Sequence, residues 1–244
     1  GSVVFRQTPA AFPAAGVATA GEEAPVATGK PMFLTEEGRN RVELVVRETE
    51  LRTRAEIVPM VVARSGLYRE APYRAGVVSA TAALALLLTT ESLWLPWGWH
   101  AGNGVLLLLL TIVAYGVGAW FGTTETGIRW FVSRERMRHK VLMRAERAFA
   151  QHGVGQTRER TGVLLLVSLL ERQVSLWPDR ALRELVPALE WEPVVATIVP
   201  HLSAGNLAEG LCAGIEHCGR FLADRLPPRP GDNPDELPNR VIQE

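Results

Sequence analysis

Residues 75–90 have the sequence AGVVSATAALALLLTT and contain no charged side chain. A second uncharged stretch, residues 101–122, contains the run LLLLLTIVAYGVGAWFG. About 20 mostly apolar residues are needed for a helix to cross the ~30 Å hydrocarbon core of a bilayer. The first stretch approaches this length when it is continued past Glu91 to Leu95, and the second reaches it. We therefore predict a two-helix transmembrane hairpin over residues 75–122.

The basic residues around this hairpin predict its orientation. Arg64, Arg69 and Arg74 precede the first span, and Arg129, Arg134, Arg136, Arg138 and Lys140 follow the second. The connecting residues 96–100, PWGWH, contain neither lysine nor arginine. Because cytoplasmic flanks of membrane spans are enriched in lysine and arginine, both ends of the chain are expected in the cytoplasm. The pattern is typical of a multi-pass protein of the bacterial inner (plasma) membrane.

Tryptophans lie near both ends of the two spans, where amphipathic aromatic rings favour the membrane–water interface. We expect Trp94, Trp97 and Trp99 at the outer interface and Trp120 and Trp130 at the inner one. Gly118 and Gly122 form a small-xxx-small pair, which allows close helix approach. Neither span has an acidic, basic or histidine residue in its interior, as a transporter or proton relay would need. The hairpin is therefore expected to be an anchor.

The segments before the hairpin carry the signals of an arm, a helix and a strand. Residues 1–33 are rich in Ala, Pro and Gly without periodicity, which indicates a disordered N-terminal arm. Thr35 is a good N-cap for a helix that continues to about residue 52. Residues 55–63 form a β-branched run of strand length, although Pro59 removes a ladder donor and prefers edges or bulges. After a turn at residues 64–66, a short helix is expected to lead into the membrane.

The segments after the hairpin predict the rest of an α/β domain. Residues 133–151 have the pattern of an amphipathic helix, and GVLLLVS at 162–168 is typical of a buried strand. Residues 171–177 alternate like a half-buried strand, so the two strands form an antiparallel hairpin. Helices are expected near residues 180–187, 191–202 and 205–225. The remaining residues, 227–244, form a proline-rich acidic tail.

Neither soluble segment is large enough to hold a good core alone. The first half, residues 34–74, has one helix and one strand, so its strand needs the 162–177 hairpin of the second half, residues 123–226, as a partner. We therefore predict one α/β domain with a small central β-sheet sandwiched between helices, interrupted by the inserted transmembrane hairpin.

Composition excludes some classes of function. The chain has 26 basic and 26 acidic residues, so it lacks the cationic field of a nucleic-acid-binding protein. Two cysteines, Cys212 and Cys218, suit a reducing compartment, and their spacing matches no common zinc motif, so we assign them to the core. Common catalytic signatures such as a P-loop or a G-x-S-x-G elbow are absent, and no catalytic residue is assigned.

Four segments carry a family resemblance. LTEEGRNRVELVVRETELRTRAEIV (34–58), SGLYR (65–69), ERTGVLLLVSLLERQV (159–174) and NPDELPN (233–239) resemble the TPM-domain proteins, and more narrowly their bacterial membrane branch. The resemblance implies an α/β sandwich. Relatives include a thylakoid protein linked to photosystem repair and a worm protein that modulates acetylcholine receptors. Some members are described as weak phosphatases, and some bind calcium or another divalent metal.

Acidic residues at the expected strand ends are the candidates for such a metal site. They are Glu56, Glu159, Glu171 and Asp179. Calcium takes several oxygen ligands, which clustered carboxylates supply. The alternative is that these are ordinary solvated or ion-paired acids, because arginines 54, 158, 160, 172 and 180 lie beside them. Residues 233–239 are likewise either a docking strip that folds back onto the domain or a flexible tail.

Two functions follow as expectations. The first is a membrane-anchored TPM-like domain that acts as a non-catalytic interaction, assembly or repair module at the cytoplasmic face. Its partners would be the lipid bilayer and a membrane protein or complex. The alternative is a domain that binds calcium or another divalent cation and has weak phosphatase activity.

Overall fold

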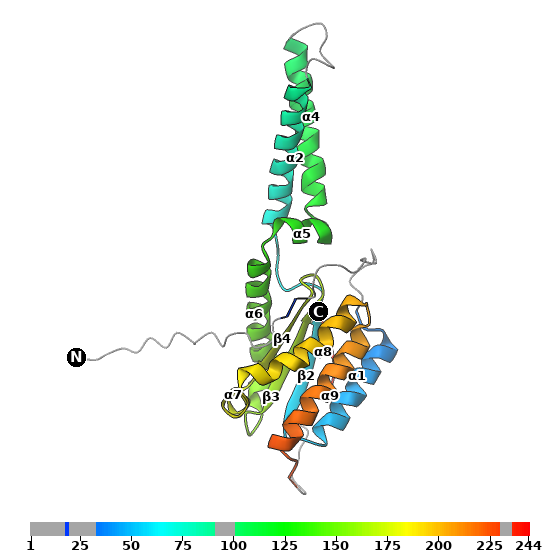
Figure 1. Cartoon of the computed structure of the whole chain (residues 1–244), viewed down its shortest axis with the longest axis vertical. Helices are drawn as coiled ribbons and strands as arrows, with labels where there is room; N and C mark the ends of the chain where they lie inside the picture. The colour runs from blue at the N-terminus through cyan, green and yellow to red at the C-terminus, as the bar shows by residue number, and fades with distance from the viewer. Residues whose placement is uncertain (1–17, 20–32, 91–100, 230–235) are drawn as a thin grey trace, which may run out of the picture. The chain divides into compact units, whose positions relative to one another are not determined.

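The computed structural model describes residues 18–19, 33–90, 101–229 and 236–244 (Figure 1). Trp94, Trp97 and Trp99 lie outside these residues, as do most of the predicted arm and residues 233–235 of the predicted strip. The chain divides into two compact units. One contains residues 1–65 and 138–244, and the other contains residues 66–137. The smaller unit therefore lies, in sequence, between two parts of the larger one.

The larger unit is built on a mixed sheet with the strand order β1-β4-β3-β2-β5. The strands are β1 (Ala18–Thr19), β2 (Glu56–Val62), β3 (Gly162–Ser168), β4 (Gln173–Pro178) and β5 (Ile242–Gln243). β2 is parallel to β3, with Ile57 opposite Val163, and β4 is antiparallel to β3. The predicted antiparallel hairpin and its pairing with the strand at residues 55–63 are confirmed. β1 and β5 were not predicted, and β1 makes the expectation of a wholly disordered arm wrong at residues 18–19.

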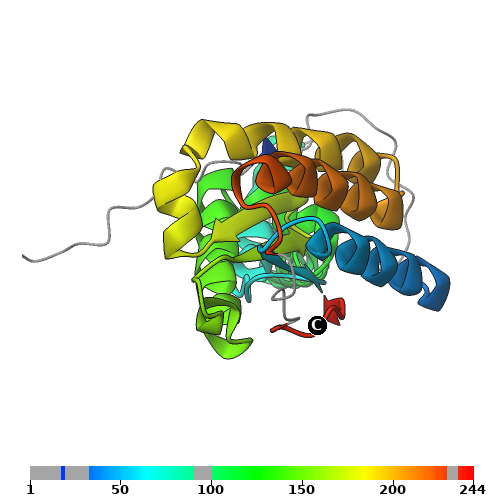
Figure 2. The same ribbon diagram turned by 90° about the horizontal axis from the view of Figure 1, so that it is seen from below.

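Helices cover both faces of this sheet (Figure 2). One face carries α1 (Glu36–Glu50), α7 (Arg180–Leu185), α8 (Glu192–Ser203) and α9 (Leu207–Arg225), which share a core with Ile57 and Val61 of β2. The other face packs Val58 and Met60 against α6 (Arg134–Gln151), whose residues from Arg138 onward belong to this unit. Successive side chains of a strand point to opposite faces of the sheet, so β2 contributes residues to both cores. The predicted α/β sandwich is confirmed.

The helices match most of the expectations. Thr35 caps α1, since its side chain accepts a hydrogen bond from the N–H of Gly38. The three helices expected after the sheet are α7, α8 and α9. One face of α9 is buried and consists of Leu207, Leu211, Ile215, Cys218 and Leu222. Cys212 is buried as well, so both cysteines are core residues, as expected.

The expectation of a half-buried second strand was wrong. Gln173 and Ser175 on β4 are as buried as Val174 between them. β4 is an inner strand, paired with β3 on one side and β1 on the other, and Ser175 lies opposite Leu166, which belongs to the core on the α6 face. A strand inside a sheet with helices on both faces has no solvent side, and the alternation of polar residues does not reveal this.

Pro59 lies within β2, and the register explains why a proline is tolerated there. Glu56 donates its N–H towards β3, to Thr161, whereas the N–H of Ala63 bonds to Glu244 on the β5 side. The backbone N–H groups of the odd-numbered residues of β2 therefore point towards β5, and those of the even-numbered residues point towards β3. Because β5 begins opposite Met60, the missing N–H of Pro59 costs no ladder bond.

The smaller unit contains α2 (Glu70–Thr89), α4 (Ala101–Phe121) and α5 (Glu125–Phe131). α2 is one continuous helix, so the separate short helix expected before the membrane is not formed. α2 and residues 103–121 of α4 are each long and apolar enough to cross a membrane. α5 was not predicted. Its C-terminal residue, Phe131, accepts a hydrogen bond of 3.0 Å from the guanidinium of Arg74 on α2.

Glycines bring α2 and α4 together. A Cβ atom on Gly118 would lie 2.2 Å from Oγ of Ser79 and 2.6 Å from the carbonyl oxygen of Ala75. A Cβ on Gly122 would lie 2.6 Å from Cα of Pro72. These distances are too short for any side chain, so the backbones touch where the small-xxx-small pair predicted close approach.

Candidate functional site

Three of the four predicted ligand residues lie at one end of the sheet. β2 begins at Glu56, Glu159 shortly precedes β3, and Asp179 directly follows antiparallel β4. The N–H of Asp179 donates to the carbonyl of Gly162 at 2.8 Å. Glu171 follows the opposite end of β3, roughly 20 Å away at about 3.3 Å per strand residue. The four acids are therefore not one cluster.

Glu159 is held by two arginines. Nη1 of Arg54 lies 2.5 Å from Oε2 of Glu159, and Nη1 of Arg229 lies 2.8 Å from its Oε1. Both carboxylate oxygens thus face a guanidinium, and the negative potential that a divalent cation requires is cancelled locally. For Glu159 the ion-paired alternative describes the structure.

Asp179 and Glu56 also bond to the backbone. Asp179 is the N-cap of α7, and its Oδ1 accepts a hydrogen bond of 2.6 Å from the N–H of Arg180. The other oxygen, Oδ2, is buried without a hydrogen-bond partner. Oε2 of Glu56 accepts from the N–H of Leu237 at 3.2 Å. These carboxylates therefore hold a helix start and the C-terminal segment in place.

Glu171 joins two loops at the opposite end of the sheet. Its Oε1 accepts a hydrogen bond of 2.9 Å from the N–H of Ser65, just after β2. Its Oε2 accepts from the hydroxyl of Ser168, the last residue of β3. The two serine hydroxyls are 2.7 Å apart. Glu171 is buried, and these contacts give it a structural task at this position.

The donor set does not fit a divalent cation as it stands. Calcium takes six to eight oxygen ligands. Among the residues that the structure describes, no three aspartate, glutamate, histidine or cysteine side chains converge on a point where an ion could bind. Metal binding at Glu56, Glu159, Glu171 and Asp179 stays a prediction.

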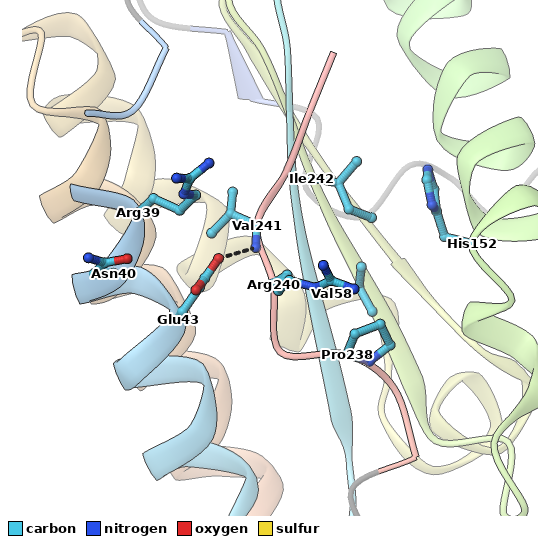
Figure 3. Close-up of a pocket in the computed structure, with 9 residues that line it drawn as sticks. All are labelled: Arg39, Asn40, Glu43, Val58, His152, Pro238, Arg240, Val241 and Ile242. Atoms are coloured by element: carbon cyan, nitrogen blue, oxygen red, sulfur yellow. Dashed lines mark hydrogen bonds between the residues drawn. The ribbon is translucent and has the colours of Figure 1, made fainter. Parts of the chain in front are cut away.

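A cleft elsewhere in the larger unit was missed by sequence reasoning. It has a volume of about 620 Å³ and is lined in part by Pro238, Arg240, Val241 and Ile242. These four belong to residues 236–244, here called the C-terminal strap. Figure 3 shows the strap between α1, which carries Arg39, Asn40 and Glu43, and His152 on the far side. The N–H of Val241 donates to Glu43 at 3.2 Å. In the sequence, only the apolar pair Val241-Ile242, late in a polar tail, could have indicated that the tail packs against the domain beside this cleft.

The strap is bonded to the sheet and to basic side chains. The N–H of Glu244 donates to Val61 at 3.0 Å, and the N–H of Ala63 donates back to Glu244 at 2.8 Å. The carboxylate of Glu244 forms an ion pair with Arg144, and its Oε1 lies 3.7 Å from Nε2 of His152. Burial, and then the positive charge of Arg144, lower the pKa of His152. Earlier in the strap, Glu236 accepts a hydrogen bond from the N–H of Arg158, and Leu237 donates its N–H to Glu56. For residues 236–239 the folded-back alternative therefore describes the structure.

Comparison with known proteins identifies the domain. Residues 124–221 match the family model described as the TPM domain. The chain carries a TPM domain. The NMR structure of the BA42 protein from the psychrophilic bacterium Bizionia argentinensis is similar, with a TM-score of 0.54 and 19% identity over 87% of this chain and 97% of that one. At this identity the likeness concerns the fold. A search of curated proteins found no match.

The match places the TPM domain on the sequence. Residues 124–221 include β3, β4 and the helices α7 and α8, but not α1 or β2. These two elements come from before the apolar hairpin and complete the same sheet and core. The strap lies beyond the matched residues. It pairs with the last part of β2, from Met60 onward, and with Ala63 directly after it.

Proposed function

We propose that this protein is a membrane-anchored TPM domain that acts as a non-catalytic interaction, assembly or repair module at the cytoplasmic face of the bacterial inner membrane. One observation carries the proposal: the surface of the apolar hairpin is uncovered. In the most apolar segment of α2 only 17% is buried, and in that of α4 only 11%. A core helix of a soluble protein would be mostly buried, whereas lipid is the solvent that suits an exposed apolar helix.

The internal packing of the hairpin supports an anchor of two helices. Leu86, Leu108 and Val113 are 64%, 61% and 61% exposed, so the large apolar side chains point away from the partner helix. The small residues Gly76, Gly118 and Gly122 lie at the contact between the helices. Small residues inside and large apolar residues outside are the arrangement expected in lipid, where helices associate through close packing.

The flanks support the proposed orientation. Trp120, at the end of α4, and Trp130, in α5, are 72% and 80% exposed, as interfacial anchors would be. Arginines occur before α2, and arginines and a lysine occur after α4, whereas residues 96–100 contain neither lysine nor arginine. We place both termini in the cytoplasm on this charge asymmetry.

The contacts of the acidic residues at the ends of the strands support a role in interaction. Glu159 is neutralised by Arg54 and Arg229, Asp179 caps α7, and Glu171 joins two loops. These groups stabilise the TPM domain itself. A stable domain tethered to the bilayer is suited to hold another membrane protein or complex, which we take as the partner.

The experiment is affinity purification of the tagged full chain from native membranes after gentle solubilisation. A tagged unrelated two-span protein is the control. We expect a membrane protein or complex to be enriched over that control, and the chain to stay in the membrane pellet after alkaline carbonate extraction. Recovery of no protein above the control would refute the interaction role, and release by carbonate would refute the anchor.

A second candidate is a divalent-cation (calcium) domain with weak phosphatase activity. The observation that favours it is the buried Oδ2 of Asp179, which lacks a hydrogen-bond partner at the same end of the sheet as Glu56. This candidate requires calcium-dependent hydrolysis of a generic phosphoester that disappears in Asp179→Ala and in Glu56→Ala. The exposed Glu184→Ala is the matched control. Activity that survives the first two substitutions comes from a contaminant.

A further inference from the structure

We infer that the side of β2 between α1 and α6 is a docking groove for an extended segment of a partner protein, and that the C-terminal strap closes this groove in cis. The inference rests on the proposed interaction function and names its recognition element. The groove takes a short strand with apolar residues on both faces and an acidic residue at each end. Each of these requirements follows from how the strap is bound.

The backbone requirement comes from β2. The strap adds a strand to the sheet through the carbonyl of Val61 and the N–H of Ala63, which both bond to Glu244. Addition of a strand to a sheet edge is a common mode of peptide recognition, in which main-chain bonds supply affinity. Further back along β2, Pro59 has no N–H, and the N–H of Ile57 is taken by Glu50. The ladder is therefore short, and selectivity must come from side chains.

The side-chain requirement comes from the two cores. Val241 is 7% exposed and lies in the core shared by α1 and α9. Ile242 and Leu237 pack against the core on the α6 face. Neighbouring residues of an extended segment point to opposite faces, so an adjacent apolar pair fills both cores at once. A partner segment needs such a pair, preceded by a further apolar residue.

The charge requirement comes from basic groups at the two ends of the groove. The N–H of Arg158 donates to Oε2 of Glu236 at 2.6 Å, and Nε of Arg158 lies 3.7 Å from Oε1. At the other end the guanidinium of Arg144 forms an ion pair with the carboxylate of Glu244. A segment with acidic ends is complementary to this pattern, and one with basic ends is repelled.

The strap is held loosely enough to be displaced. Val241 is its one buried residue, whereas Pro238, Arg240 and Glu244 are exposed. Besides the cleft of about 620 Å³, a second hollow of about 340 Å³ lies between the strap and α1. Partly exposed ion pairs such as those of Glu236 and Glu244 contribute little to stability, because water screens them. Segments with few buried apolar contacts open at low free-energy cost.

Because the strap is covalently connected to the domain, it competes strongly with a free partner for the groove. Arg54 donates its N–H to the carbonyl of Leu226, and Leu237 donates its N–H to Glu56. Leu226 and Leu237, on either side of the connecting residues, are thus both bonded close to the start of β2, at Arg54 and Glu56. A tether of this kind gives an effective concentration in the millimolar range, against which a free partner must compete.

The test uses the full chain in detergent, with a protease recognition sequence inserted between Asp232 and Asn233. The probe is a fluorescent peptide of residues 236–244, ELPNRVIQE, and binding is measured by anisotropy before and after cleavage. We expect saturable binding by the cut protein, at least ~10²-fold tighter than by the uncut protein. The peptide with Glu244→Lys should bind weakly to the cut protein, and Arg144→Glu in the protein should restore its binding.

The remaining outcomes overturn the proposal. Equal binding before and after cleavage would show that the strap does not guard a groove. A cut protein that stays folded by circular dichroism but binds no peptide would show that there is no groove. Unfolding when the strap is exchanged would make the strap part of the core, and strap exchange between uncut copies into a dimer would make a second copy the occupant. None of these results would change the membrane pull-down, so the two proposals fail separately.

Discussion

Oε1 of Glu50, the last residue of α1, accepts a hydrogen bond of 2.8 Å from the backbone N–H of Ile57, the second residue of β2. Both residues are buried, at 8% and 2% exposure. The N–H of Ile57 points to the side of β2 that β5 does not reach, so the carboxylate replaces a missing strand partner. A buried N–H without a partner is costly, which explains an acidic side chain in the core.

Glu50→Ala should therefore destabilise the TPM domain by about 1–3 kcal/mol, the cost of leaving a buried group unsatisfied. Glu50→Gln keeps an acceptor oxygen and should lose less. The exposed Glu48→Ala, on the same helix, is the control and should change stability by less than about 0.5 kcal/mol. Unfolding in mild detergent followed by tryptophan fluorescence measures all three, and equal midpoints for Glu50→Ala and Glu48→Ala would contradict the assignment.

Gly118→Ala should weaken the apolar hairpin, because the new Cβ would meet Ser79 and the backbone of Ala75 at 2.2 and 2.6 Å. Overpacking of this kind costs about 1–3 kcal/mol. Gly116→Ala is a matched control on the same helix, since a Cβ there has no neighbour within 4 Å. Thermal denaturation in detergent should give a lower midpoint for Gly118→Ala alone. A similar loss in both variants would mean that the helices do not touch at Gly118.

Neither cysteine should react quickly with iodoacetamide in the folded protein. Burial raises the pKa of the Cys212 and Cys218 thiols. The thiolate is the reactive form, so burial lowers both its population and its access to reagent. Mass spectrometry should find both sites modified after denaturation and neither after a short native incubation. Rapid native labelling of Cys218 would place it outside the core.

The slow native thiols make the proposed topology testable with single added cysteines. His100→Cys lies between the two apolar helices in sequence, and His139→Cys lies at an exposed position of α6. A membrane-impermeant maleimide added to spheroplasts should label the first and spare the second until the membrane is opened. The reverse pattern would invert the orientation, and labelling of both in intact spheroplasts would contradict membrane insertion.

Acidification should destabilise the domain partly through His152. Burial and the charge of Arg144 lower its pKa from the ordinary value of 6.5, although Glu244, 3.7 Å away, acts in the opposite direction. The unfolded chain therefore binds a proton before the folded one does. Stability from this group is complete above about pH 6.5 and declines as the pH falls towards the lowered value. The thermal midpoint of His152→Gln should fall less than that of the wild type between about pH 7.5 and 5.5. Parallel curves would exclude a contribution of His152.

Elements that depend on near neighbours in the chain could be predicted from the sequence. Thr35 caps α1 because its hydroxyl accepts a hydrogen bond from the N–H three residues further on. Both helices of the hairpin follow from uncharged runs of sufficient length. The pairing of β3 with β4 follows from two strands separated by a short turn. In each case the interactions that decide the structure lie within one element or one turn.

The candidate site depended on register and packing between distant segments. Glu171 and Glu159 are both near β3, yet the strand carries them to opposite ends of the sheet, and the arginines that neutralise Glu159 come from residues 54 and 229. The sequence by itself determined the helices, the paired strands and the two apolar helices, because local periodicity encodes them. Only the tertiary structure decided that a polar tail becomes an edge strand, because the acceptor and donor that hold it, on Val61 and Ala63, are far from Glu244 in the chain.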